Sequence, residues 1–114
     1  MKLYFEKNIR IINELMTYFH RLGCNDINVK LNTKETYSTF TIWGKVGEIR
    51  SEDLLKLDRM LNIPRQRELE EYFWSIDSDC QFEEDLSVVG IMTDKVDVTY
   101  NESILKLQVH RNDI

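Results

Sequence analysis

The stretch INVKLNTKETYSTFTIW, residues 27–43, decides the fold, because its hydrophobic residues recur with a period of two. Ile27, Val29 and Leu31 alternate with polar residues, and the second half of the stretch is rich in aromatic and β-branched side chains. A polar segment, residues 33–36, separates the two halves. The pattern therefore predicts two adjacent strands joined by a short turn, as in a β-hairpin.

Helical periodicity precedes this hairpin. Apolar residues recur at intervals of three and four between residues 3 and 22, which predicts a helix with one buried stripe. The stripe consists of Ile9, Ile12, Met16 and Phe19, with Leu15 and Leu22 beside it. Gly23 follows and can end the helix in the left-handed conformation.

Two further helices are predicted after the hairpin. Ser51 is a good N-cap for the first of them. Its apolar face consists of Leu54, Leu57 and Leu61. Pro64 ends this helix and can occupy the first turn of the next one. The apolar face of that next helix consists of Leu69, Phe73 and Ile76.

A second hairpin is predicted near the end of the sequence, where residues 96–100 and 105–109 alternate in hydrophobicity. The segment before it, residues 86–93, is apolar and fits either a strand or a short buried helix. The order of elements predicts one α+β domain over residues 1–114. We expect a two-layer sandwich with helices on one face of a mainly antiparallel, mixed sheet.

The composition limits the classes of partner. The formal net charge of −5 argues against a nucleic-acid partner, which requires a basic face. No stretch approaches the ~20 apolar residues of a membrane span, and charged residues interrupt the N-terminal segment. We therefore predict a cytoplasmic protein without a membrane partner. Cys24 and Cys80 lack a CxxC neighbour and are expected to be free thiols.

No set of side chains predicts catalysis or metal binding. Asp77 and Asp79 begin an acidic segment, residues 77–85, but the glycine and glutamate of a calcium-binding loop are missing from it. His20 and His110 have no second ligand at metal-binding spacing. We therefore expect no catalytic residue, metal or cofactor.

Three stretches cover most of the chain and share the hydrophobic frame of a known family. They are Glu14-Leu-Met-Thr-Tyr18, INVKLNTKETYSTFTIWGKVG at residues 27–47, and LSVVGIMTDKVDVTYNESILKLQVHR at residues 86–111. Together they resemble the ATP-binding fold of sensor histidine kinases, and especially its anti-sigma-factor serine kinase branch. The resemblance implies that residues 85–94 form a helix packed on the sheet.

The resemblance also implies a nucleotide site that has lost its chemistry. Tyr18 stands where the family has the asparagine that binds Mg²⁺, and a phenol is a poor ligand for that ion. Trp43 stands where the family has the aspartate that accepts a hydrogen bond from adenine. In place of the second glycine-rich box, residues 83–85 carry three carboxylates that would repel phosphates. The implied protein is a degenerate member that does not bind ATP.

Four residues would contact a nucleotide if one binds. Glu14 matches the family's glutamate, Tyr18 follows it on the same helix, Gly44 lies near the family's glycine loop and Gly47 matches its last glycine. A structural role for Glu14 and turn roles for the glycines are the alternatives.

Aromatic residues supply the candidates for protein contact. Tyr72, Phe73 and Trp74 are consecutive, so they point about 100° apart on a helix and one core face cannot hold all three. We expect Tyr72 and Trp74 to contact a partner, with packing inside the domain as the alternative. Tyr37 and Trp43 are the next candidates, on the outer face of the first hairpin.

The sequence thus favours a non-catalytic regulatory or protein-interaction domain, with a protein partner or a homodimer. One alternative is a divergent, ATP-binding serine kinase of the anti-sigma type. A second is a sensing domain that holds a small ligand between helices and sheet.

Overall fold

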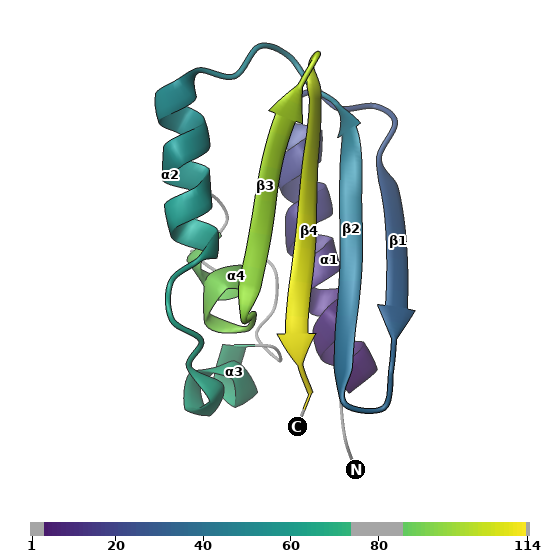
Figure 1. Ribbon diagram of the computed structural model, residues 1–114, viewed down its shortest axis with the longest axis vertical. Coiled ribbons are helices and arrows are strands. Elements are labelled where there is room, and N and C mark those ends of the chain that lie inside the picture. Colours follow the sequence, from purple (N-terminus) through teal and green to yellow (C-terminus); the bar gives the residue numbers. More distant parts are fainter. Residues whose placement is uncertain (1–3, 74–85, 114) are drawn as a thin grey trace.

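Four strands form one sheet, which is the front layer of the molecule in Figure 1. Their bounds are Asn28–Thr33 (β1), Tyr37–Lys45 (β2), Lys95–Asn101 (β3) and Ile104–Asn112 (β4). The computed structural model describes residues 4–73 and 86–113. The strand order is β1-β2-β4-β3 and every neighbouring pair is antiparallel, so both predicted hairpins are confirmed.

The helices are placed against this sheet by their apolar sides. Their bounds are Tyr4–Arg21 (α1), Ser51–Leu61 (α2), Arg67–Phe73 (α3) and Ser87–Ile91 (α4). Helix α1 crosses behind β2 and β4, and α2 runs beside β3 (Figure 1). Helix α4 resolves the ambiguity of residues 86–93 in favour of a short helix.

The sheet is buried on one face only. Along β2 and β4 buried and more exposed residues alternate, and Phe40, Ile42, Leu105 and Leu107 are at most 1% exposed. These side chains pack with Leu15 and other residues of the helices in one core. The opposite face of the sheet carries most of the polar side chains of the strands. The predicted α+β sandwich with helices on one face is therefore confirmed.

One residue of the edge strand β3 is capped by a side chain of the segment that follows α2. The amide of Asn62 donates to the carbonyl oxygen of Val96 at 2.9 Å, and its oxygen accepts from the Val96 N–H at 2.9 Å. One side chain thus occupies both hydrogen-bonding groups of a strand residue. No contact of this kind closes the other edge strand, β1, among the described residues.

The buried stripe of α1 differs from the prediction. Ile9 is 44% exposed and Met16 is 39% exposed, whereas Ile11 and Leu15 are buried. The prediction placed Ile9 and Met16 in the core with Ile12 and Phe19, but only the latter two are buried. The helix has apolar residues over about half of its circumference, so periodicity alone did not fix which of them face the sheet.

Three local predictions in the middle of the chain need correction. Arg50, rather than Ser51, is the N-cap of α2. Pro64 lies between helices, because α2 ends at Leu61 and α3 begins at Arg67. Among the described side chains of α3, Glu70 is buried and Leu69 is 37% exposed. The side chain of Phe73 and all of Ile76, the other members of that predicted face, lie outside the described part of the chain.

Candidate functional site

The residues expected at a nucleotide site do not converge on one hollow. A hollow of about 270 Å³ lies between α1 and α2, and Tyr18 is the only one of the four candidates that lines it. The remaining lining residues are Leu22, Glu48, Ile49, Asp53, Lys56, Leu57 and Met60. This volume is below the roughly 300–1,000 Å³ that is typical of small-molecule sites.

The chemistry of this hollow is unfavourable for a nucleotide. Burial raises the pKa of the Tyr18 phenol, and the negative charge of Asp53 raises it further. The phenol therefore stays neutral and cannot act as an anionic ligand for Mg²⁺. Glu48 and Asp53 contribute two carboxylates to the lining against the single ammonium of Lys56. Two carboxylates oppose a polyphosphate.

The other three candidates have local structural contacts. Glu14 pairs with Arg10 one turn earlier in α1, at 3.1 Å. Gly44 lies so close to the Cys24 region that an added Cβ would be 2.4 Å from the sulfur of Cys24. Gly47 accepts a hydrogen bond from the hydroxyl of Tyr100 at 3.0 Å. Each residue thus has a structural contact that needs no ligand.

The aromatic contact candidates fall in two places. Tyr37 and Trp43 occupy outward positions of β2, and Tyr37 is 47% exposed. Tyr72 lies in the last turn of α3, but its side chain is outside the described part of the chain, as is all of Trp74. Tyr37 and Trp43 therefore lie on the outer face of the first hairpin, as predicted.

A buried ionic cluster, which the sequence did not predict, joins α3 to α1 and β4. The carboxylate of Glu70 accepts from the ammonium of Lys7 at 3.0 Å, and from the guanidinium groups of Arg65 at 2.9 Å and Arg111 at 3.2 Å. All four side chains are at most 6% exposed. Unpaired, any of these charges would be costly to bury.

The cluster continues from Arg111 into the sheet. The guanidinium donates to the carbonyl of Met92 at 2.8 Å and to the side chain of Asn8 at 2.7 Å. Asn8 donates to the hydroxyl of Ser38 at 3.1 Å, which donates to Asp113 at 2.6 Å. Each charge meets a partner inside the protein, so the cluster positions elements rather than presenting reactive groups to solvent.

The ionisation of Glu70 reflects these partners. Burial alone would raise the pKa of its carboxyl, but Arg111, Lys7 and Arg65 together hold that pKa below its ordinary value. Burial also lowers the pKa of Arg111, and the charge of Glu70 opposes that shift. One sequence signal could have revealed the cluster. Arg111 continues the inward-facing series of Leu105, Leu107 and Val109, so it required a buried partner.

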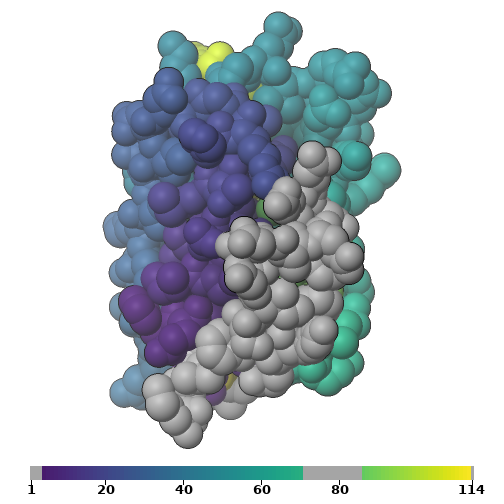
Figure 2. Space-filling view, turned by 180° about the vertical axis from the view of Figure 1, so that it is seen from behind, coloured from purple at the N-terminus to yellow at the C-terminus, as the bar shows by residue number. Residues whose placement is uncertain are grey.

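An exposed apolar surface is the second feature that the sequence did not predict. We call it the α1–β1 surface and define it by Phe5, Ile9, Met16 and Val29, which are 57%, 44%, 39% and 38% exposed. Ile9 and Tyr18 are nine positions apart, which places them about 180° apart on the helix. Tyr18 faces α2, so Ile9 lies on the side of α1 away from α2. Viewed from behind, α1 and β1 lie side by side (Figure 2).

The described part of the chain does not bring metal ligands together. Within residues 4–73 and 86–113, no group of three His, Cys, Asp or Glu side chains could hold a metal ion. Among the residues that the structure describes, His110 contacts one carboxylate, that of Asp97, at 3.2 Å. Cys24 is buried as a free thiol, and Cys80 lies outside the described residues, as does the acidic segment 77–85. In the same ranges, no helix is both long and apolar enough to cross a lipid bilayer.

Comparison with known proteins gives no identity. No family model matches the chain, and no curated protein matches it significantly.

Proposed function

We propose that this chain is a non-catalytic protein-interaction domain that pairs with a second copy of itself through the α1–β1 surface. The observation that carries the proposal is the position of Ile9 and Met16. Both were expected in the core, and both are exposed beside Phe5 on an 18-residue helix. Exposed apolar side chains gathered on one side of a helix mark an association surface more often than scattered ones do.

A second copy is favoured over another protein because β1 is an open edge strand beside these side chains. Strands of two identical chains can pair across a two-fold axis, and the same axis would bring the apolar side of each α1 toward its counterpart. Val29, on the inward face of β1, would then be covered together with Ile9 and Met16.

The hollow between α1 and α2 supports the part of the proposal that the domain does not bind ATP. Its small volume and the carboxylates of Glu48 and Asp53 support a degenerate histidine-kinase-like site rather than a working one. The alternative of a divergent serine kinase requires ATP and Mg²⁺ to bind there. The alternative of a ligand sensor requires an apolar ligand small enough for about 270 Å³.

Sedimentation equilibrium of the whole chain tests the self-association. We expect a dimer, and a shift to monomer in the double variant Ile9→Lys/Met16→Lys, because each chain would bring two ammonium groups to the interface and four would be buried around the axis. Leu55→Lys is the matched control, since Leu55 is 56% exposed on α2 and away from this surface. A wild-type monomer at 100 µM, or equal effects of both variants, would contradict the proposal.

Isothermal titration with Mg-ATP on the same sample tests the nucleotide site. We expect no saturable heat. Binding tighter than about 1 mM, which corresponds to about 4 kcal/mol, would favour the kinase alternative instead. Mg-ATP binding and its absence can each be observed whether the protein is a dimer or a monomer in the sedimentation experiment.

A further inference from the structure

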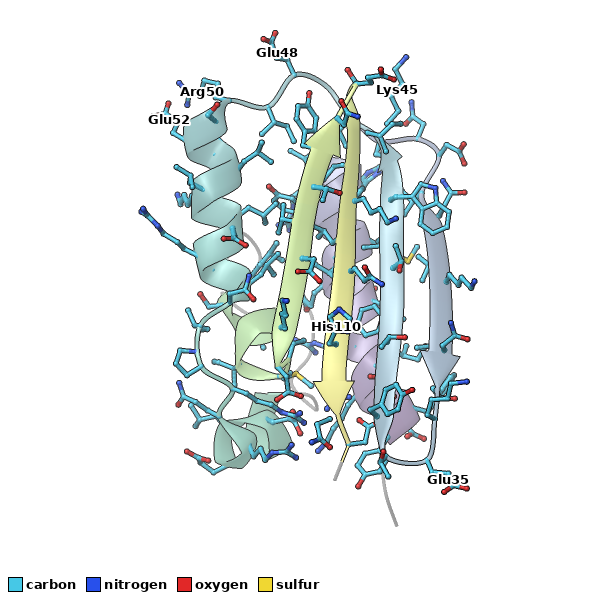
Figure 3. All side chains as sticks on the ribbon, in the orientation of Figure 1. Glu35, Lys45, Glu48, Arg50, Glu52 and His110 are labelled. Carbon is cyan, nitrogen blue, oxygen red and sulfur yellow. The ribbon has the colours of Figure 1, made fainter. Side chains whose placement is uncertain are left out.

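The outer face of the sheet has the opposite charge to the chain as a whole. The chain has a formal net charge of −5, yet Asp97 is the one acidic residue in the four strands. The lysines of the strands are Lys30, Lys45, Lys95 and Lys106, and all four are exposed. In Figure 3 His110 lies over this face of β4, and Lys45 lies at the end of β2. Every other acidic residue of the chain lies outside these four strands.

Three of these lysines surround Trp43. In the strand register Trp43 lies opposite Lys106 of β4, and Lys45 follows two residues later on the same face of β2. Lys30 pairs with Thr41, so it lies diagonally across from the indole. Among the described residues, none of these three lysines forms an ion pair, whereas Lys95 pairs with Asp97 at 3.5 Å.

The surface around Trp43 is hollowed. A depression of about 320 Å³ is lined by Lys30, Thr41, Trp43, Ile104 and Lys106. It therefore combines an aromatic ring, one aliphatic side chain and two unpaired ammonium groups on an open antiparallel sheet. Glu35 and Glu102, the acidic residues of the two hairpin turns, lie at opposite ends of the sheet.

We propose that this outer sheet face binds single-stranded nucleic acid, with a base stacked on the Trp43 indole and phosphates bound by the surrounding lysines. Proteins that bind single strands combine a positively charged track with aromatic platforms, and open four-stranded sheets serve this purpose. A protein partner fits this face less well, because lysine is depleted in the cores of protein interfaces and Ile104 is the only aliphatic anchor in the depression. The proposal differs from the prediction that the chain has no nucleic-acid partner. That prediction used the net charge of the whole chain, which does not show that the outer sheet face is basic.

Fluorescence anisotropy with fluorescein-labelled 12-nucleotide oligouridine and oligothymidine tests the proposal. At 50 mM salt we expect binding that weakens with rising salt, as counterions are released from the strand. The double variant Lys30→Gln/Lys106→Gln should weaken it about tenfold or more and reduce the slope of log K against log salt by roughly 1.4. The control Lys56→Gln/Arg59→Gln removes the same charge from exposed positions of α2 and should change affinity less than twofold.

Tryptophan fluorescence in a Trp74→Phe background reports on the indole directly, because Trp43 is then the only tryptophan. Stacking of a base should quench this fluorescence on titration with oligouridine. Equal weakening by both double variants, or binding without quenching, would overturn the proposal. If poly-glutamate bound and neither oligonucleotide did, the proposal would also be overturned. The face would then be assigned to an acidic protein segment. The Ile9→Lys/Met16→Lys variant should bind oligouridine like the wild type, so failure of the dimer proposal does not affect this test.

Discussion

Arg111 donates a hydrogen bond to Glu70 at 3.2 Å, although the two residues are 41 positions apart and both side chains are buried. This contact attaches the short helix α3 to the last strand of the sheet. Lys7 and Arg65 bind the same carboxylate, so one acidic side chain is shared by three cations from different parts of the chain.

Replacing Glu70 with Gln should destabilise the domain severely. The variant would leave three buried cations without their shared anion, and breaking a buried ion pair typically costs about 3–5 kcal/mol. The free energy of unfolding from urea titration checks this. Glu68→Gln, in the same helix but exposed, should change it by less than about 0.5 kcal/mol. Similar effects of the two substitutions would mean that the cluster contributes little.

Stability should fall at acidic pH partly through Glu70. The pKa of this carboxyl is lowered in the folded protein, so its contribution is present above the unfolded pKa of about 4.3 and is lost as pH falls through the folded pKa. The wild type should therefore lose unfolding free energy more steeply than Glu70→Gln as pH falls below about 5. Urea titrations at a series of pH values measure both slopes, and parallel curves would contradict the prediction.

The two glycines of the candidate loop should respond oppositely to alanine. At Gly44 a Cβ would lie 2.4 Å from the sulfur of Cys24 and 2.8 Å from the carbonyl oxygen of Asp26. Overpacking of this kind costs about 1–3 kcal/mol. At Gly47 a Cβ meets open space, so Gly47→Ala should be neutral or slightly stabilising. Thermal melting of both variants gives the comparison. A Gly44→Ala protein as stable as the wild type would show that the segment before β1 can move away from residue 44.

Asn62→Ala should loosen α2 from β3. The substitution removes both hydrogen bonds to the backbone of Val96 and leaves that residue's N–H and carbonyl without them, at a cost of about 1–3 kcal/mol. Hydrogen exchange at the Val96 amide should become faster. Asn25→Ala, which replaces an exposed asparagine in the segment before β1, serves as the control. If the Val96 amide of the Asn62→Ala variant exchanged as slowly as in the wild type, the role of Asn62 would be refuted.

The sheet and its hairpins could be predicted from sequence because their period-two pattern is local. Residues 27–43 contain both partners of the first strand pair, so no distant information was required. Helix α4 could not be assigned in this way, because five residues are too few for a period to be measured.

The contacts that link distant segments could not be predicted. Glu70 stands among Glu68 and Glu71 in a charged helix, and nothing nearby distinguishes the buried carboxylate from its exposed neighbour Glu68. Its partners come from α1, the segment before α3 and β4. The exposure of Ile9 and Met16 was missed for a related reason, because an apolar side chain shows the same helical spacing whether it faces a core or a partner.

The side-chain cap on β3 has a consequence for assembly. A sheet with two free edges can add copies at both and grow without limit, whereas Asn62 occupies Val96 on the β3 edge and α2 runs beside that strand. Strand β1 is therefore the more accessible edge. Two chains joined through β1 would each have used that edge, so Asn62 and α2 together would favour a finite eight-stranded layer over an open-ended fibre.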